Sequence, residues 1–179
     1  MLTYLATALP RFCSPAARLL ALQCALRTNG RGEVHLPHGL LRGMRLHQRA
    51  DLWDELEYAH WLHRGAGPFM RACLLDAAMR AQPDRPRRAR AAHWALPPLP
   101  RPASAALPSA VQLTALTVAA HTRPDGAGSA DMDLLTHLCA QTPQQLTDLL
   151  DELTGSRLLS SWRRAPQETE VVWHLLCPR

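Results

Sequence analysis

The chain has 179 residues, of which 47% are hydrophobic and 20% are charged, and its formal net charge is +5 at pH 7. This length suits one ordinary domain or two small ones, and the composition is typical of a soluble globular protein. The longest apolar stretches are cut short by Arg18 and Gln23, well below the ~20 residues that a membrane span requires, so no membrane partner is expected. No positive charge precedes the apolar N-terminal run, and we therefore expect a cytoplasmic protein.

The first predicted element is a helix that begins at Ser14-Pro15. Serine caps a helix N-terminus well, and proline is tolerated at the first helical position because the missing N–H would be unpaired there. Apolar residues then fill one side of a helix that runs to about Arg27, and the turn-forming TNGRG at 28–32 ends it. The elements expected next are a very short strand at 33–36, a short helix at 37–44, a longer helix at about 47–59, and a hairpin of 61–64 and 69–75 around a glycine-proline turn.

The second half of the chain is expected to repeat this order. A helix starts at 107–109 and ends at RPDGAG, residues 123–128. Asp131 is placed to cap a short helix that runs through Leu138. Thr142-Pro143-Gln144-Gln145 combines a capping box with a proline at the first helical position, which is a strong start signal for a helix that Gly155 closes. The second hairpin is expected from residues 158–163 and 169–175.

One acidic, leucine-bearing hexapeptide occurs twice, as DLWDEL at 51–56 and as DLLDEL at 148–153. The same offset of 97 residues carries Leu41 onto Leu138 and Leu62 onto Leu159. The repeated phrase therefore indicates a duplicated unit of about 65 residues.

Residues 77–106 separate the two copies. The stretch DAAMRAQ at 76–82, which leads into this segment, favours a helical turn, whereas the frequent prolines of the remainder predict an extended, semi-rigid linker. Arg85, Arg87, Arg88 and Arg90 make this segment strongly basic. Contact with nucleic acid and a merely solvated spacer are both open interpretations.

All twenty basic residues are arginine, and they are distributed unequally. Residues 1–106 carry fifteen arginines against seven acidic residues, a net charge of +8, whereas residues 107–179 carry five against eight, a net charge of −3. The two halves are therefore expected to face different partners, or one partner unequally.

A three-helix core closed by a β-hairpin resembles the winged helix-turn-helix domain, and the resemblance covers residues 12–76 and again 107–177. It rests on the order and lengths of the elements, because helix-turn-helix sequences are degenerate. The expected fold class is mainly α with small β-hairpin wings (α+β), as two tandem winged-helix domains joined by the basic, proline-rich linker 77–106. The tandem arrangement is similar to plasmid replication initiators, to regulators from high-GC actinobacteria and to scaffold subunits of chromosome-condensing complexes.

The resemblance implies that the third helix of each unit lies in the DNA major groove with its N-terminal residues at the base edges. Arginine donates two hydrogen bonds to guanine, and glutamine pairs with adenine. The residues implied in the first unit are Arg45, His47, Gln48 and Arg49 at the bases with Arg42 just before them, and Arg64 and Arg71 at phosphates. The acidic residues that follow, from Asp51 to Glu57, would face away from DNA, and an exposed arginine-rich helix without DNA is the alternative interpretation.

In the second unit the resemblance implies that Gln144, Gln145 and Thr147 read bases and that Arg163 and Arg164 bind phosphates. The aspartates and glutamates around them add unfavourable potential, so this unit is expected to bind DNA weakly alone. A homodimer contact, or a protein partner on the acidic C-terminal domain, is the other expectation.

The expected function is sequence-specific binding of double-stranded DNA, most simply as a transcriptional regulator on the nucleoid. The alternative is a non-catalytic assembly protein of the replication or segregation type, suggested by Trp162 and Trp173 on the acidic unit's hairpin, although both fit a core equally well. Binding to RNA is a further open interpretation, although neither unit carries the aromatic motifs of common RNA-binding modules.

No catalytic Ser/His/Asp or Cys/His spacing and no phosphate-binding glycine loop occur, so no enzyme is expected. The cysteines form no CxxC pair, and the two His-x-x-His pairs lack nearby ligand partners. Reduced thiols, no metal site and no cofactor are predicted.

Overall fold

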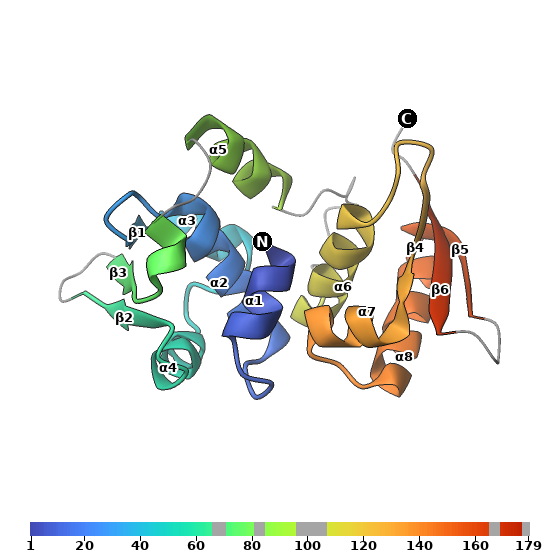
Figure 1. Ribbon diagram of the computed structural model, residues 1–179, viewed down its shortest axis with the longest axis horizontal. Coiled ribbons are helices and arrows are strands. Elements are labelled where there is room, and N and C mark those ends of the chain that lie inside the picture. Colours follow the sequence, from blue (N-terminus) through green and yellow to red (C-terminus); the bar gives the residue numbers. More distant parts are fainter. Residues whose placement is uncertain (66–70, 81–84, 96–106, 165–168, 177–179) are drawn as a thin grey trace. The chain divides into compact units, whose positions relative to one another are not determined.

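The computed structural model describes residues 1–65, 71–80, 85–95, 107–164 and 169–176. The chain divides into two units, Met1–Leu96 and Pro97–Arg179, each with helices and one three-stranded antiparallel sheet (Figure 1). The fold is therefore mixed α+β, as the sequence predicted. No helix within the described residues is long and apolar enough to cross a bilayer.

The first unit is built around one buried helix, α2 (Pro15–Arg27). The other elements of the unit are α1 (Leu2–Ala8), β1 (Glu33–His35), α3 (His38–Gly43), α4 (Ala50–Tyr58), β2 (Leu62–Arg64), β3 (Arg71–Leu74), the 3₁₀ helix η1 (Ala77–Arg80) and α5 (Arg85–Trp94). Every residue of α2 from Ala16 to Leu26 is buried, because α1, α4, α5 and β1 all pack against it. The central strand of the sheet is β3, with β1 and β2 antiparallel on its two sides.

The start of α2 follows the sequence prediction. The hydroxyl of Ser14 accepts a hydrogen bond from the backbone N–H of Ala17 at 3.2 Å, and Pro15 occupies the first helical position. Arg18 is 3% exposed, and its guanidinium donates to the carbonyls of Leu9 and Cys13 at 3.2 Å. A buried guanidinium is tolerated because carbonyl oxygens replace its water. These bonds hold the α1–α2 connection against α2.

Helix α1 has no counterpart among the elements expected from the sequence. Its Tyr4 hydroxyl donates to the carboxylate of Asp76 at 2.5 Å and accepts from the indole N–H of Trp61 at 3.3 Å. Burial, together with the bond to Asp76, raises the pKa of Tyr4 to about 12. The helix is thus fastened to residues that flank the β2–β3 hairpin, a contact between segments more than 50 residues apart.

The second unit contains α6 (Ser109–Ala120), β4 (Ala127–Asp131), α7 (Met132–Cys139), α8 (Pro143–Gly155), β5 (Leu159–Arg164) and β6 (Glu170–Leu175). Asp131 caps α7, and Thr142 with Gln145 forms the complete capping box of α8, as predicted. Residues from all three helices and from the sheet share one hydrophobic core: Val111, Ala115, Val118, Met132, Leu135, Cys139, Leu146, Leu150, Leu153, Leu159, Val171 and Trp173.

The two sheets have the same topology and the same register. In each, the third strand is central and the first strand lies on one side of it, in the orders β1-β3-β2 and β4-β6-β5. Leu62 lies opposite Leu74, and Leu159 opposite Leu175, at the start of the two hairpins. The second hairpin differs by an irregularity between Leu159 and Ser161.

Left-handed backbone positions also recur in matching places. Within the described residues, positive φ angles occur at Gly32, Arg45 and His60 in the first unit and at Gly126, Ala140 and Arg157 in the second. In each unit the first precedes the first strand of the sheet, the second follows the short helix, and the third follows the long helix. Since this conformation costs a non-glycine residue roughly 1 kcal/mol or more, its recurrence at three matching places indicates one backbone path used twice.

Strand β4 was not among the predicted elements. Its sequence AGSAD lacks the β-branched and aromatic residues that favour strands. The strand is imposed by pairing with β6, where Gly128 lies opposite Trp173. A Cβ at Gly128 would lie 2.4 Å from Trp173 Nε1, so the glycine leaves room for the indole.

The predicted extended linker is wrong for residues 85–94, which form α5. The only proline of this stretch is Pro86, at the second helical position, where the absent N–H breaks no intrahelical bond. Ala92 and Ala95 are buried, and the packing of α5 on α2 stabilises a helix that is too short to persist alone. The rest of the predicted linker, residues 81–84 and 96–106, lies outside the described residues.

Candidate nucleic-acid interface

The connection between α3 and α4 carries most of the base-reading residues expected in the first unit. Helix α3 ends in a Schellman motif, with the N–H of Leu46 bonded to the carbonyl of Leu41 at 2.8 Å and that of Arg45 to Arg42 at 3.0 Å. Leu46 is 2% exposed and anchors the turn in the core. Arg45, at φ 58°, is therefore held on the outside of the turn, and the side chain of Arg42 is exposed one residue before the helix ends.

The prediction that the third helix starts near His47 is wrong, because α4 begins at Ala50. Arg45, His47 and Gln48 consequently lie in the turn before the helix, and Arg49 is its N-cap residue. No side chain caps this helix N-terminus. Residues 46–49 lack a serine or threonine of the kind that caps α2 and α8.

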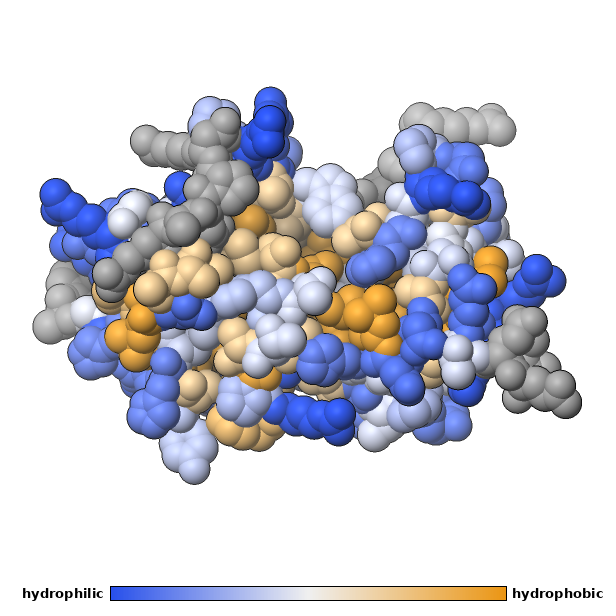
Figure 2. Space-filling model, in the orientation of Figure 1, coloured by the Kyte–Doolittle hydropathy of each residue, from blue (hydrophilic) through white to orange (hydrophobic). Residues whose placement is uncertain are grey.

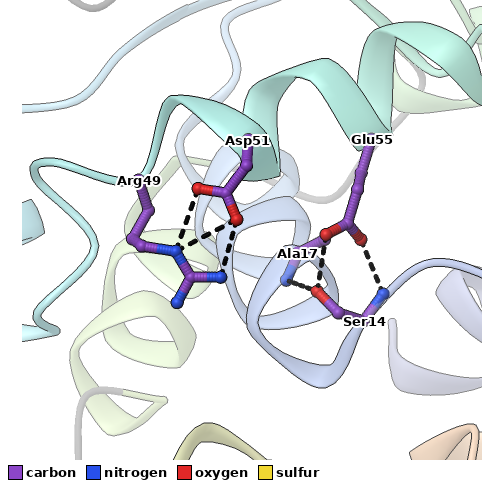
Figure 3. Close-up of polar contacts among 5 residues, drawn as sticks. All are labelled: Ser14, Ala17, Arg49, Asp51 and Glu55. Carbon is purple, nitrogen blue, oxygen red and sulfur yellow. Dashed lines mark hydrogen bonds and ion pairs between the residues drawn. The ribbon is translucent and has the colours of Figure 1, made fainter.

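Arg49 is engaged in an ion pair within its own segment (Figure 3). Its Nε lies 2.9 Å from Asp51 Oδ1 and its terminal nitrogen 2.7 Å from Oδ2. The hydrogen bond to Asp51 raises the pKa of Arg49, and the same bond lowers that of Asp51. Both side chains are about half exposed, so a phosphate would have to displace the aspartate to bind this arginine.

Glu55 points toward the start of α2 and not toward solvent (Figure 3). Its carboxylate accepts the Ser14 N–H at 2.7 Å and the Ser14 hydroxyl at 3.0 Å, while that hydroxyl accepts the N–H of Ala17. A negative charge at a helix N-terminus is favourable because unpaired N–H groups and the helix dipole both point there. Glu55 therefore stabilises the packing of α4 against the start of α2.

Arg64 is also held by acidic residues of α4. Its Nε donates to Glu57 Oε2 at 2.6 Å, and its terminal nitrogen lies 2.6 Å from Asp54 Oδ1. The backbone N–H of Arg64 donates to Glu57 Oε1 at 2.8 Å and lowers the pKa of that carboxyl group. These bonds fasten β2 to α4, and the geometry assigns Arg64 to this contact more readily than to a phosphate.

Arg71 is the first residue of β3 and is exposed on the outer face of the first sheet. It lines a shallow groove of about 490 Å³ together with His35, His63 and Cys73. Among the described residues, no three histidine, cysteine or acidic side chains come together in a way that could hold a metal ion. None of the four described cysteines forms a disulfide bond, and of these four only Cys73 is not buried.

In the second unit the predicted base-reading residues lie on the first two turns of α8. The side-chain amide of Gln144 donates to Asp148 at 2.9 Å, and the Thr147 hydroxyl donates to the carbonyl of Pro143 at 3.0 Å. The Gln145 side chain accepts the Thr142 N–H at 2.9 Å in the capping box. Both glutamines are exposed. The Gln145 bond forms part of the helix cap, whereas the Gln144 bond to Asp148 is one that a base edge could replace.

Arg163 and Arg164 end strand β5 with exposed side chains. Residues 165–168, which follow them in the chain, lie outside the described residues, as do residues 66–70 between the two strands of the first hairpin. The two tryptophans of the second hairpin differ. Trp173 is 2% exposed and belongs to the core, whereas Trp162 is partly buried and donates its indole N–H to Asp151 at 2.8 Å.

The repeated hexapeptide has a structural role that the sequence analysis did not assign. Its second aspartate binds the second strand in both units, through Asp54 to Arg64 and through Asp151 to Trp162. Arg64 and Trp162 also occupy equivalent register positions, opposite Ala72 and Trp173 of the two central strands. The signal was present in the sequence, since both copies keep this aspartate.

Comparisons with known proteins give no relative for the chain: no family model, curated protein or solved structure matches it.

Proposed function

We propose that each unit is a winged helix-turn-helix domain and that the chain binds double-stranded DNA sequence-specifically, as a transcriptional regulator. The support for the domain is the order helix, strand, helix, helix and hairpin, with the first strand paired to the third, in both units. Three matching left-handed positions support the duplication further.

The observation that carries the DNA proposal is the turn between α3 and α4 of the first unit. Arg42 and Arg45 are exposed there, and among the described residues their side chains have no hydrogen-bond or ion-pair partner. Gln48 is exposed in the same turn. Two arginines and a glutamine are the side chains that bind phosphates, guanine and adenine. Arg49 would join them only by leaving Asp51.

The test begins with selection of a bound sequence from random duplexes by the full chain. In the variant Arg42→Ala/Arg45→Ala, we expect the affinity for the selected duplex to fall roughly 100-fold, because each base contact is worth about 1–3 kcal/mol. The matched control is Arg11→Ala/Arg157→Ala, which removes the same charge from exposed positions outside the turn. Equal affinity of both variants for the selected duplex would refute the assignment of the reading turn.

A second candidate function concerns the second unit, which would bind a protein partner or a second copy of the chain. Asp133, Asp148 and Glu152 are exposed, and within the described residues no arginine pairs with them. If this face met DNA, changing Asp148 and Glu152 to asparagine and glutamine would strengthen duplex binding. An unchanged duplex affinity favours a protein partner for this unit.

A further inference from the structure

Helix α5 is the most basic element of the described chain. Its ten residues, RPRRARAAHW, include four arginines and one histidine and no acidic residue. The function proposed above makes no use of it, since the reading turn lies between α3 and α4.

Packing against α2 fixes the orientation of α5 on the first unit. Ala92 and Ala95 are buried, and half-buried Arg88 donates to the carbonyl of Thr28 at the C-terminus of α2. A cation at that end is favourable because the last carbonyls of a helix carry partial negative charge. Arg88 and Ala92, together with Ala95 just after the helix, therefore hold the inner side of α5 against the first unit.

The outer side of α5 is basic and exposed. Arg87, Arg90 and Trp94 follow a spacing of three and four residues, which places them on one face, and His93 is exposed beside them. Trp94 is 45% exposed. Figure 2 shows hydrophilic side chains over α5 at the top of the view. In Figure 1, α5 and α4 lie at opposite sides of the first unit, so the two elements present separate surfaces.

We propose that the outer face of α5 binds phosphates of the DNA backbone, outside the segment that the α3–α4 turn reads. The proposal rests on the proposed function in one respect, namely that the polyanion is duplex DNA. An anionic membrane is the competing polyanion. Helices that bind membranes bury an apolar face at the lipid interface, but the apolar side of α5 is already covered by α2, and Trp94 is the one large apolar side chain on its outer face. The observations therefore favour DNA.

The experiment measures the affinity of the full chain for a random-sequence duplex across a range of salt concentrations. Each phosphate contact contributes about 0.9 to the slope of log K against log salt concentration. We expect Arg87→Ala/Arg90→Ala to make the slope shallower by about 2 and to leave the preference for the selected over a scrambled duplex unchanged. Arg11→Ala/Arg157→Ala is again the matched control, and circular dichroism verifies that each variant is folded.

The possible outcomes separate this inference from the proposed function. An α5 variant with the wild-type slope, or one no shallower than the control, overturns the inference while leaving sequence reading by the α3–α4 turn intact. Loss of binding to phosphatidylserine vesicles without a change in duplex binding would assign α5 to a membrane and also overturn it. If the duplex slope changes as expected but no sequence is preferred, the inference holds and sequence-specific reading fails.

Discussion

Helix α4 of the first unit and helix α8 of the second end alike and begin differently. Both α4 and α8 end two residues after the repeated hexapeptide. Each is followed at the matching position by a residue with a positive φ angle, His60 after α4 and Arg157 after α8. However, α8 has 13 residues and starts with a capping box, whereas α4 has nine and starts at an N-cap without side-chain bonds. The end of the helix is thus fixed by buried leucines and strand contacts shared by both units, while its start depends on local capping residues that only one unit has.

At one matching position of the two sheets, the larger side chain comes from the first strand in the first unit and from the third strand in the second unit. In the first unit Val34 of β1 lies opposite Ala72 of β3, and in the second Gly128 of β4 lies opposite Trp173 of β6. Each pair combines a large and a small residue, as close packing requires. The duplicated backbone therefore accepts two different solutions for one space.

The strongest test of this equivalence is Gly128→Val, which introduces the residue of the first unit into the second. A Cβ at this position would lie 2.4 Å from Trp173 Nε1, so we expect the free energy of unfolding to fall by more than ~3 kcal/mol in denaturant titrations. Trp173→Ala alone leaves a cavity and should cost about 3–5 kcal/mol. The double variant recreates the Val34–Ala72 pair. We therefore expect it to lose clearly less free energy of unfolding than the two single variants lose together. Strict additivity would show that the two positions are not equivalent.

A smaller effect on stability is expected at Glu55, which forms hydrogen bonds that its counterpart in the second unit, Glu152, does not form within the described residues. Glu55 binds the N–H and hydroxyl of Ser14, the N-cap of α2, whereas Glu152 at the matching position is exposed and the N-cap of α6, Pro108, has neither group. Glu55→Ala should lower the free energy of unfolding by ~1–2 kcal/mol, and Glu152→Ala by less than ~0.5 kcal/mol. Equal losses for the two variants would contradict the assigned contact.

The smallest effect is a difference in acid sensitivity. The N–H of Arg64 lowers the pKa of Glu57 in the folded chain, whereas Thr154 at the matching position of the second unit does not titrate. A carboxyl group with a lowered folded pKa stabilises the protein above its unfolded pKa of about 4.3, and this stabilisation is lost as the pH falls through the folded value. Glu57→Gln should therefore be less stable than wild type at pH 7, by at most ~1 kcal/mol, and equal to it near pH 3. If denaturant titrations gave the same difference in free energy of unfolding at both pH values, this would argue against the bonds from Arg64 to the Glu57 carboxylate.

The sequence predicted the elements whose signals lie within a few residues. The starts of α2, α7 and α8 follow from Ser14-Pro15, Asp131 and the Thr142 capping box, and both hairpins follow from short apolar runs around turn residues. It did not predict β4 or the helical state of α5, and it started α4 too early. Strand pairing decides β4 and packing on α2 decides α5, and both depend on residues outside the local pattern. The late start of α4 reflects residues 46–49, which offer no side chain that caps the helix.

For the candidate interface, too, some features follow from the sequence and others only from the tertiary structure. The sequence by itself determined the repeated hexapeptide, the excess of arginine in the first half and the residue types that precede α4. Only the tertiary structure decided which arginines are available, because a guanidinium takes whichever carboxylate or carbonyl the fold places beside it. Arg64 meets Glu57 and Asp54 in this way, Arg88 meets Thr28, and Arg42 and Arg45 remain exposed at a turn.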